Sequence, residues 1–108
     1  MTMPKKGSRL VDVNGVSYRF MVREEGRQVF DQNDLNPVRE NLKVLVEAVD
    51  SPGHILTAIF NRFKNPGLDP VGPKSVIRLV QIALKQGWAP KVMANFVLAE
   101  SAIATLRR

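Results

Sequence analysis

The segment GPKSVIRLVQIALKQGWAP, at positions 72–90, places the strictest limits on how this chain can fold. Pro73 suits the first position of an α-helix, because its fixed φ is already helical and the N–H that it lacks would have no partner there. Gly87 suits the left-handed residue that follows a helix, and Trp88 suits the apolar partner of that cap. The proline two residues later prevents the helix from resuming. The spacing therefore predicts a helix from Pro73 to Gln86, with Trp88 buried against its end.

The predicted helix is apolar around more than half of its circumference. Its polar positions form one stripe, made of Lys74, Arg78, Gln81 and Lys85. A helix with so little polar surface must be packed on more than one side. We therefore expect it to be the core helix of the fold.

The N-terminal part of the chain has the two-residue alternation of a β-hairpin. Asn14-Gly15 is a strong hairpin signal, because a type I′ turn needs positive φ at both of its central residues. With that turn, one face carries Val11, Val13, Val16, Tyr18, Phe20 and Val22, and the other carries Leu10, Asp12, Ser17, Arg19, Met21 and Arg23. A second turn at Glu25-Gly26 would pair Val22 with Val29 and place both on the apolar face. This pattern predicts a three-stranded antiparallel meander.

Two more helices are predicted between the meander and the core helix. Asn36-Pro37 and Ser51-Pro52 both have the character of an N-cap followed by a first helical proline. Apolar residues at spacings of three and four then predict helices over Pro37–Val49 and Pro52–Lys64. Residues 91–106 fit either one helix or a short strand at Phe96–Leu98 followed by a short helix from Ser101, and we adopt the second interpretation.

These elements predict a flexible tail over residues 1–8 and a single α+β domain over residues 9–108. The fold is an N-terminal three-stranded meander packed on about three helices, with a short C-terminal strand and helix. The chain has no cysteine, no apolar leader segment near its start, and no run of the ~20 apolar residues that a membrane span needs. We therefore expect a soluble, cytoplasmic protein that does not associate with membranes.

The sequence offers little for catalysis. His54 is the single histidine and has no cysteine or second histidine to pair with, and the adjacent Glu24 and Glu25 point apart at a predicted turn. There is no glycine-rich phosphate loop and no metal-ligand spacing. The sequence therefore predicts no catalytic residue, no metal and no cofactor, and favours a protein that is not an enzyme.

The net charge of +6 favours a polyanionic neighbour. Lys74, Arg78 and Lys85 form a row of cations on a segment without any acidic residue, which suits contact with a phosphate backbone. Arg19 and Arg23, interleaved with Met21 on the outward face of the meander, could add to such a site. The competing interpretation is that these are solvated polar positions, since removing the four cations nearest the chain ends leaves a net charge of +2.

The outward face of the meander also carries exposed apolar residues, namely Leu10, Met21 and Phe30. A second layer or another subunit covering these residues would explain them, and a three-stranded sheet has open edges that favour a partner. The sequence therefore predicts a protein-interaction module that forms a homodimer, with any other protein partner unidentified. Sequence-independent binding of nucleic acid is the alternative.

The segments VNGVSYRF (Val13–Phe20) and GPKSVIRLVQIALKQGWAP together resemble small bacterial accessory proteins encoded in mobile gene cassettes. Those proteins begin with an Asn/Asp-Gly hairpin and contain a proline-started helix that ends in Gly-Trp-x-Pro, followed by a short strand with phenylalanine. Here Gly72 stands where Thr or Ser is usual, and Ala89 stands where Asp is usual. The resemblance implies an α+β fold and carries no activity over to this chain.

Overall fold

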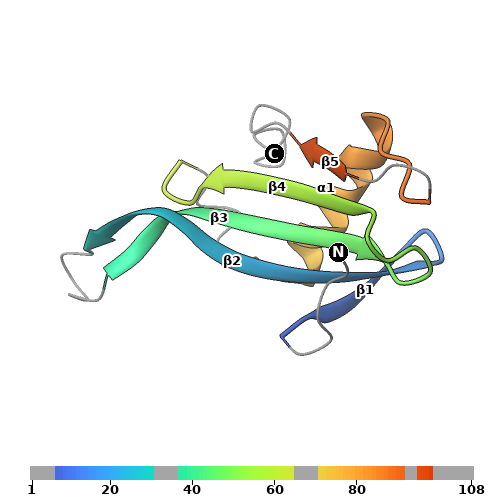
Figure 1. Cartoon of the computed structure of the whole chain (residues 1–108), viewed down its shortest axis with the longest axis horizontal. Helices are drawn as coiled ribbons and strands as arrows, with labels where there is room; N and C mark the ends of the chain where they lie inside the picture. Colours follow the sequence, from blue (N-terminus) through green and yellow to red (C-terminus); the bar gives the residue numbers. More distant parts are fainter. Residues whose placement is uncertain (1–6, 31–36, 65–70, 92–94, 99–108) are drawn as a thin grey trace.

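A computed structural model describes residues 7–30, 37–64, 71–91 and 95–98, and it consists of one five-stranded sheet with a helix on one face (Figure 1). The elements, in chain order, are β1 (Arg9–Val13), β2 (Val16–Phe30), β3 (Pro37–Ala48), β4 (Ile55–Asn61), α1 (Pro73–Lys85) and β5 (Asn95–Leu98). The strands lie in the sheet in this same order. Neighbours are antiparallel except β4 and β5, which are parallel. A parallel pair needs a crossover connection, and the segment that contains α1 supplies it.

The predicted packing of a three-stranded meander on three helices is wrong, because the described residues contain one helix and five strands. Most of Pro37–Val49 forms β3. Apolar residues occupy six of the eight positions from 42 to 49, so they fit both a helical spacing and a two-residue alternation. The sheet selects the alternation and buries Leu42, Val44, Val46 and Ala48. Valine in this run also favours a strand, because β-branched side chains pack well on a pleated surface.

The predicted helix over Pro52–Lys64 is also wrong. Pro52-Gly53 belongs to the loop between β3 and β4, and Gly53 has a φ of 93°. A Pro-Gly pair is a turn signal, and it explains this proline better than a helix start does. Residues 55–61 then form β4, with Leu56, Ala58 and Phe60 buried in strict alternation.

The predicted turn at Glu25-Gly26 is replaced by a β-bulge within one long strand. The pairing of β2 with β3 shifts between Glu25 and Gln28, so that Gly26 and Arg27 together oppose one residue, Glu40. Arg27 N donates a hydrogen bond to Glu40 Oε1 (3.3 Å). The extra residue reverses the alternation of β2, because side chains alternate with a period of two. Val29 therefore returns to the apolar face, as predicted, but through a bulge and opposite Val38.

The hairpin register and the end of the helix are confirmed. Val13 pairs with Val16 and Val11 with Tyr18 around a turn in which Asn14 has a φ of 53°. At the end of α1, Trp88 N donates to Ala83 O (2.9 Å) and Gly87 N to Leu84 O (3.3 Å), with Gly87 at a φ of 105°. These two bonds form the Schellman motif.

The C-terminal strand is confirmed as β5, and it extends the sheet beside β4. Residues 1–6 of the predicted tail and the predicted helix from Ser101 lie outside the described residues. None of the helices in the described part of the chain is long and apolar enough to cross a membrane.

The core lies between α1 and the inner face of the sheet, where inward side chains of β1 to β5 meet the helix. From α1, the buried residues are Val76, Leu79, Val80 and Ala83. Trp88 is 3% exposed, and its ring lies 5.8 Å from that of Tyr18, centroid to centroid, at 40°. Trp88 thus fastens the end of α1 to the β1–β2 hairpin, mainly through apolar contact, since its Nε1 has no hydrogen-bond partner among the described residues.

The bulge generates a first prediction. Replacing Gly26 with alanine should destabilise the fold by more than about 1 kcal/mol, because φ is +89° and an added Cβ would lie 2.9 Å from Glu40 Cγ. Gly15→Ala is the matched control, since Gly15 has a φ of +80° but no atom within 4 Å of the added Cβ. Urea unfolding should rank Gly26→Ala as clearly less stable than Gly15→Ala. Equal midpoints would show that contact with Glu40 does not constrain this position.

Tyr18 generates a second prediction. Burial raises the pKa of Tyr18 above its usual value of 10.0. The contribution of this group to stability is therefore fully present below pH ~10 and is lost as the pH rises through the folded-state pKa. Tyr18 is the single tyrosine, so absorbance near 295 nm reports it directly. Ionisation at the same pH in the folded protein and in the urea-unfolded chain would contradict the buried position.

Candidate functional site

The face of the sheet opposite α1 is covered by no described element. In Figure 1 the strands lie in front and α1 passes behind them. Because side chains alternate along each strand, every second residue of each strand points to this open face. Val97 is 69% exposed and Leu10 is 61% exposed, which are large fractions for apolar residues in a sheet.

A row of three apolar residues and one threonine crosses the open face from β2 to β5. Met21 pairs with Leu45, Leu45 with Thr57, and Thr57 with Val97. Ile59, which is 38% exposed, adds to this row from the next pair along β4. We call these residues and Leu10 the open-face patch: Leu10, Met21, Leu45, Thr57, Ile59 and Val97.

Charged residues of both signs flank the open-face patch. On one side Arg19 lies opposite Glu47, and Arg19 Nη1 donates a hydrogen bond to Ser8 Oγ (3.2 Å). On the other side Arg23 lies opposite Lys43, and Lys43 Nζ forms an ion pair with Glu25 (3.4 Å). The open face is therefore an apolar row between two mixed-charge rows, without a strong excess of either sign.

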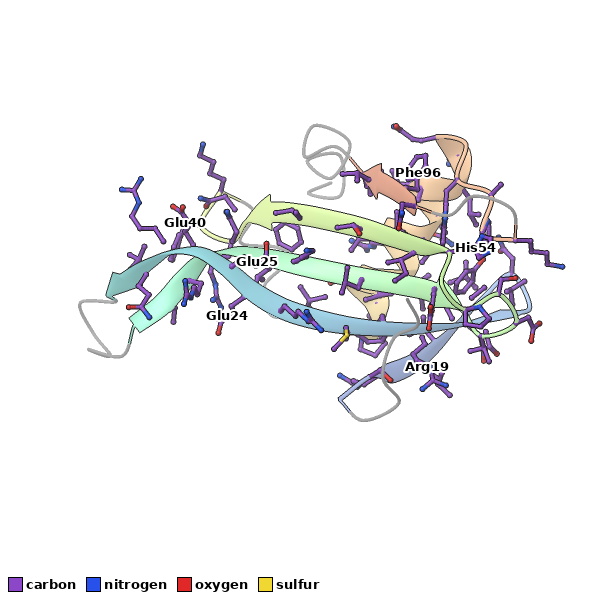
Figure 2. The ribbon with its side chains drawn as sticks, in the orientation of Figure 1. Arg19, Glu24, Glu25, Glu40, His54 and Phe96 are labelled. Carbon is purple, nitrogen blue, oxygen red and sulfur yellow. The ribbon has the colours of Figure 1, made fainter. Side chains whose placement is uncertain are left out.

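Glu47 is buried although its strand position points to the open face. It is 3% exposed, and it accepts a hydrogen bond from Gly53 N at Oε2 (2.8 Å). The carboxylate thus binds the β3–β4 loop to the sheet. Figure 2 shows Arg19 and His54 at this same end of the molecule, whereas Glu24, Glu25 and Glu40 lie toward the other end. Glu47 is for these reasons a structural residue.

Nothing in the described part of the chain groups three or more histidine, aspartate or glutamate side chains as metal ligands. His54 is half-buried in the loop before β4 and makes an interaction within the fold.

The sequence analysis predicted some of the residues on the open face and missed others. Leu10 and Met21 share this face with Arg19 and Arg23, as predicted from the hairpin register. Phe30 lies at the far end of β2, opposite Pro37, and its side chain is outside the described residues. The prediction missed Leu45 and Ile59, because their segments were assigned to helices. The alternation in β3 and β4 was the signal that could have found them.

The predicted cations do not form a single site. Lys74, Arg78 and Lys85 are exposed on α1, whose opposite side is buried against the sheet. Arg19 and Arg23 lie on the open face, so the sheet separates the two sets.

A depression of about 440 Å³ lies beside the helix cations. Asn14, Gln81, Leu84 and Lys85 line it. It therefore joins the tip of the β1–β2 hairpin to the C-terminal half of α1.

Comparisons with protein-family models, with curated proteins and with solved structures gave no match to this chain. Its function must therefore be argued from the two surfaces described above.

The position of Glu47 generates a third prediction. Glu47→Ala should lower the free energy of unfolding by about 2 kcal/mol, because it removes a buried hydrogen bond to a charged group. Glu25→Ala is the control, since it removes an ion pair whose side chains are 29% and 42% exposed and should cost about 0.5 kcal/mol or less. Urea unfolding of both variants checks this. Equal losses of unfolding free energy in the two variants would show that Glu47 contributes no more to stability than an exposed residue does.

Proposed function

We propose that this protein is a non-enzymatic protein-interaction module that forms a homodimer by packing two open faces together. The observation that carries the proposal is the open-face patch. It has members on all five strands and is left uncovered by every described element. Exposed apolar groups that are contiguous and rimmed by polar residues are typical of protein–protein interfaces.

The size of the molecule supports this arrangement. The chain extends 44 × 31 × 20 Å, and the sheet spans the two longer directions. A specific interface needs about 800 Å² from each partner. A face of these dimensions has room for that area, and packing two of them would place the two copies of α1 on the outside.

Pairing through the unpaired edge of β2 is less favourable than pairing through the face. Beyond residue 20, the outer edge of β2 has no partner strand among the described residues. This stretch contains the bulge at Gly26 and the charged residues Arg23, Glu24, Glu25 and Arg27. Bulges and edge charges are the features by which proteins block the addition of another strand.

The chemistry of the open face favours protein over single-stranded nucleic acid. Binding of single strands on a sheet relies on aromatic side chains that stack with bases. Among the described strand residues, Tyr18, Phe20 and Phe60 are buried on the inner face, and the open-face patch contains no aromatic residue. Its charges are also mixed, which suits a second copy that carries the same mixed rows.

The proposal predicts a reversible dimer at micromolar concentration. Val97→Lys and Leu10→Lys should each raise the dimer dissociation constant by about tenfold or more, equivalent to ~1.4 kcal/mol, because each buries an unpaired charge in the interface. Sedimentation velocity over a dilution series measures this constant. Both residues are highly exposed, so the variants should fold normally.

Gln81→Lys is the matched control, since it adds the same charge at an exposed position on α1. It should leave the dissociation constant unchanged. A wild-type protein that remains monomeric at tens of micromolar would contradict the proposal. Equal weakening by Gln81→Lys and Val97→Lys would show an effect of net charge instead of an interface on the sheet.

A further inference from the structure

The charges of the molecule are distributed unevenly between the sheet and the helix. The acidic side chains of the sheet have partners: Asp12 accepts from Ser17, Glu24 pairs with Arg62, and Glu25 pairs with Lys43. Glu40 and Glu47 accept hydrogen bonds from backbone N–H groups. In contrast, α1 contains no acidic residue at all. The positive charge of α1 is thus not neutralised within the described structure.

The exposed cations of α1 are arranged in a line. Lys74, Arg78 and Lys85 are separated by four and seven residues, which are helical repeats, so they share one face. At a rise of 1.5 Å per residue, Arg78 lies about 6 Å along the axis from Lys74, and Lys85 lies about 10 Å further. Lys74 in the first turn opposes the helix dipole, so helix stability does not account for it. A line of cations with this spacing suits an extended chain of phosphates.

The depression adjoins the end of this line, and Lys85 belongs to both. Two of its other lining residues, Asn14 and Gln81, have amide side chains that can both donate and accept hydrogen bonds, as the edge of a nucleobase requires. The fourth, Leu84, is half-buried and offers an apolar surface. A volume of about 440 Å³ is within the range of small-ligand sites.

We propose that α1 and the tip of the β1–β2 hairpin form a binding site for single-stranded nucleic acid. Phosphates bind along Lys74, Arg78 and Lys85, and one unstacked base enters the depression between Asn14 and Gln81. A single strand fits better than a duplex, because bases in a duplex are stacked and cannot enter a depression. The site does not depend on the proposed dimer, since α1 lies on the other side of the sheet from the open face.

Fluorescence anisotropy with a short, labelled single-stranded oligonucleotide of mixed sequence at ~50 mM salt tests the site. We expect a dissociation constant of tens of micromolar or lower. The logarithm of the affinity should fall against log[salt] with a slope near −2, as expected for about three phosphate contacts on a single strand.

Variants of Arg78 and Gln81 test the line of cations and the depression separately. Arg78→Glu should weaken binding at least about tenfold. Lys64→Glu makes the same charge change at an exposed position after β4 that belongs neither to α1 nor to the lining of the depression, so it should have little effect. Gln81→Ala should weaken binding of the oligonucleotide and leave binding of inorganic polyphosphate unchanged. The emission of the buried Trp88 verifies that each variant is folded.

Four results would overturn the proposal. The first is a flat titration to about 100 μM, a concentration at the weak end of the dissociation constants for non-specific binding at physiological salt. The second is an equal loss of affinity for Lys64→Glu and Arg78→Glu. The third is equal affinity for duplex and single strand. The fourth is displacement of the oligonucleotide by polyglutamate at matched charge, which would indicate that the cations of α1 bind an acidic protein instead of nucleic acid. If Gln81→Ala left the affinity for the oligonucleotide unchanged, the placement of a base in the depression would be wrong.

Discussion

The burial of one face of the sheet beneath α1 is the interaction on which the rest of this structure depends. Val44, Val46, Leu56 and Phe60 are each no more than 1% exposed on the sheet, and Val76 and Val80 are fully buried on the helix. At ~25 cal/mol for each Å² of apolar surface removed from water, such burial is the main stabilising contribution to a small domain. Because α1 is the one described element outside the sheet and packs on a single face, no described element covers the opposite face. The candidate interaction surface is thus a direct consequence of how the core is built.

The end of α1 shows how local and tertiary effects support each other. Gly87 permits the left-handed residue that closes the helix, and the same cap turns Trp88 back toward the sheet. There Trp88 contacts Tyr18, which lies on the strand that the Asn14-Gly15 turn positions. The cap of the helix and the turn of the hairpin therefore meet at one aromatic contact, close to the depression beside Asn14 and Lys85. The proposed nucleic-acid site is built where these two rigid local features come together.

The sheet also divides the molecule into two chemically different sides. The open side has apolar residues between rows of mixed charge, which suits a protein surface. The helix side has cations without acidic neighbours on the same element, which suits a polyanion. Since α1 packs against the inner face, its cations can only point away from the open face. The two proposed activities can therefore operate together without competing for residues.

The sequence by itself determined the elements whose signals are local. The Asn14-Gly15 turn requires positive φ, which set the register of β1 and β2 and hence the faces of Leu10, Met21, Arg19 and Arg23. The helix from Pro73 and the burial of Trp88 follow from proline and glycine at fixed positions. The cation stripe followed from the helix. These features were predictable because each is controlled by residues within a few positions of one another.

Tertiary structure decided between helix and strand for the apolar runs of residues 37–64, where the local strand and turn signals competed with a helical spacing. The apolar runs in this stretch fit both a helix and a strand, and the presence of β2 as a partner with unpaired backbone groups selected the strand. The same applies to Gly26, which is compatible with a turn or a bulge until β3 lies opposite it. Leu45, Ile59 and Val97 join the open-face patch through pairing between strands that are far apart in the chain. The separation of the sheet cations from the helix cations likewise depends on which face α1 covers, and a one-dimensional pattern carries no information about that.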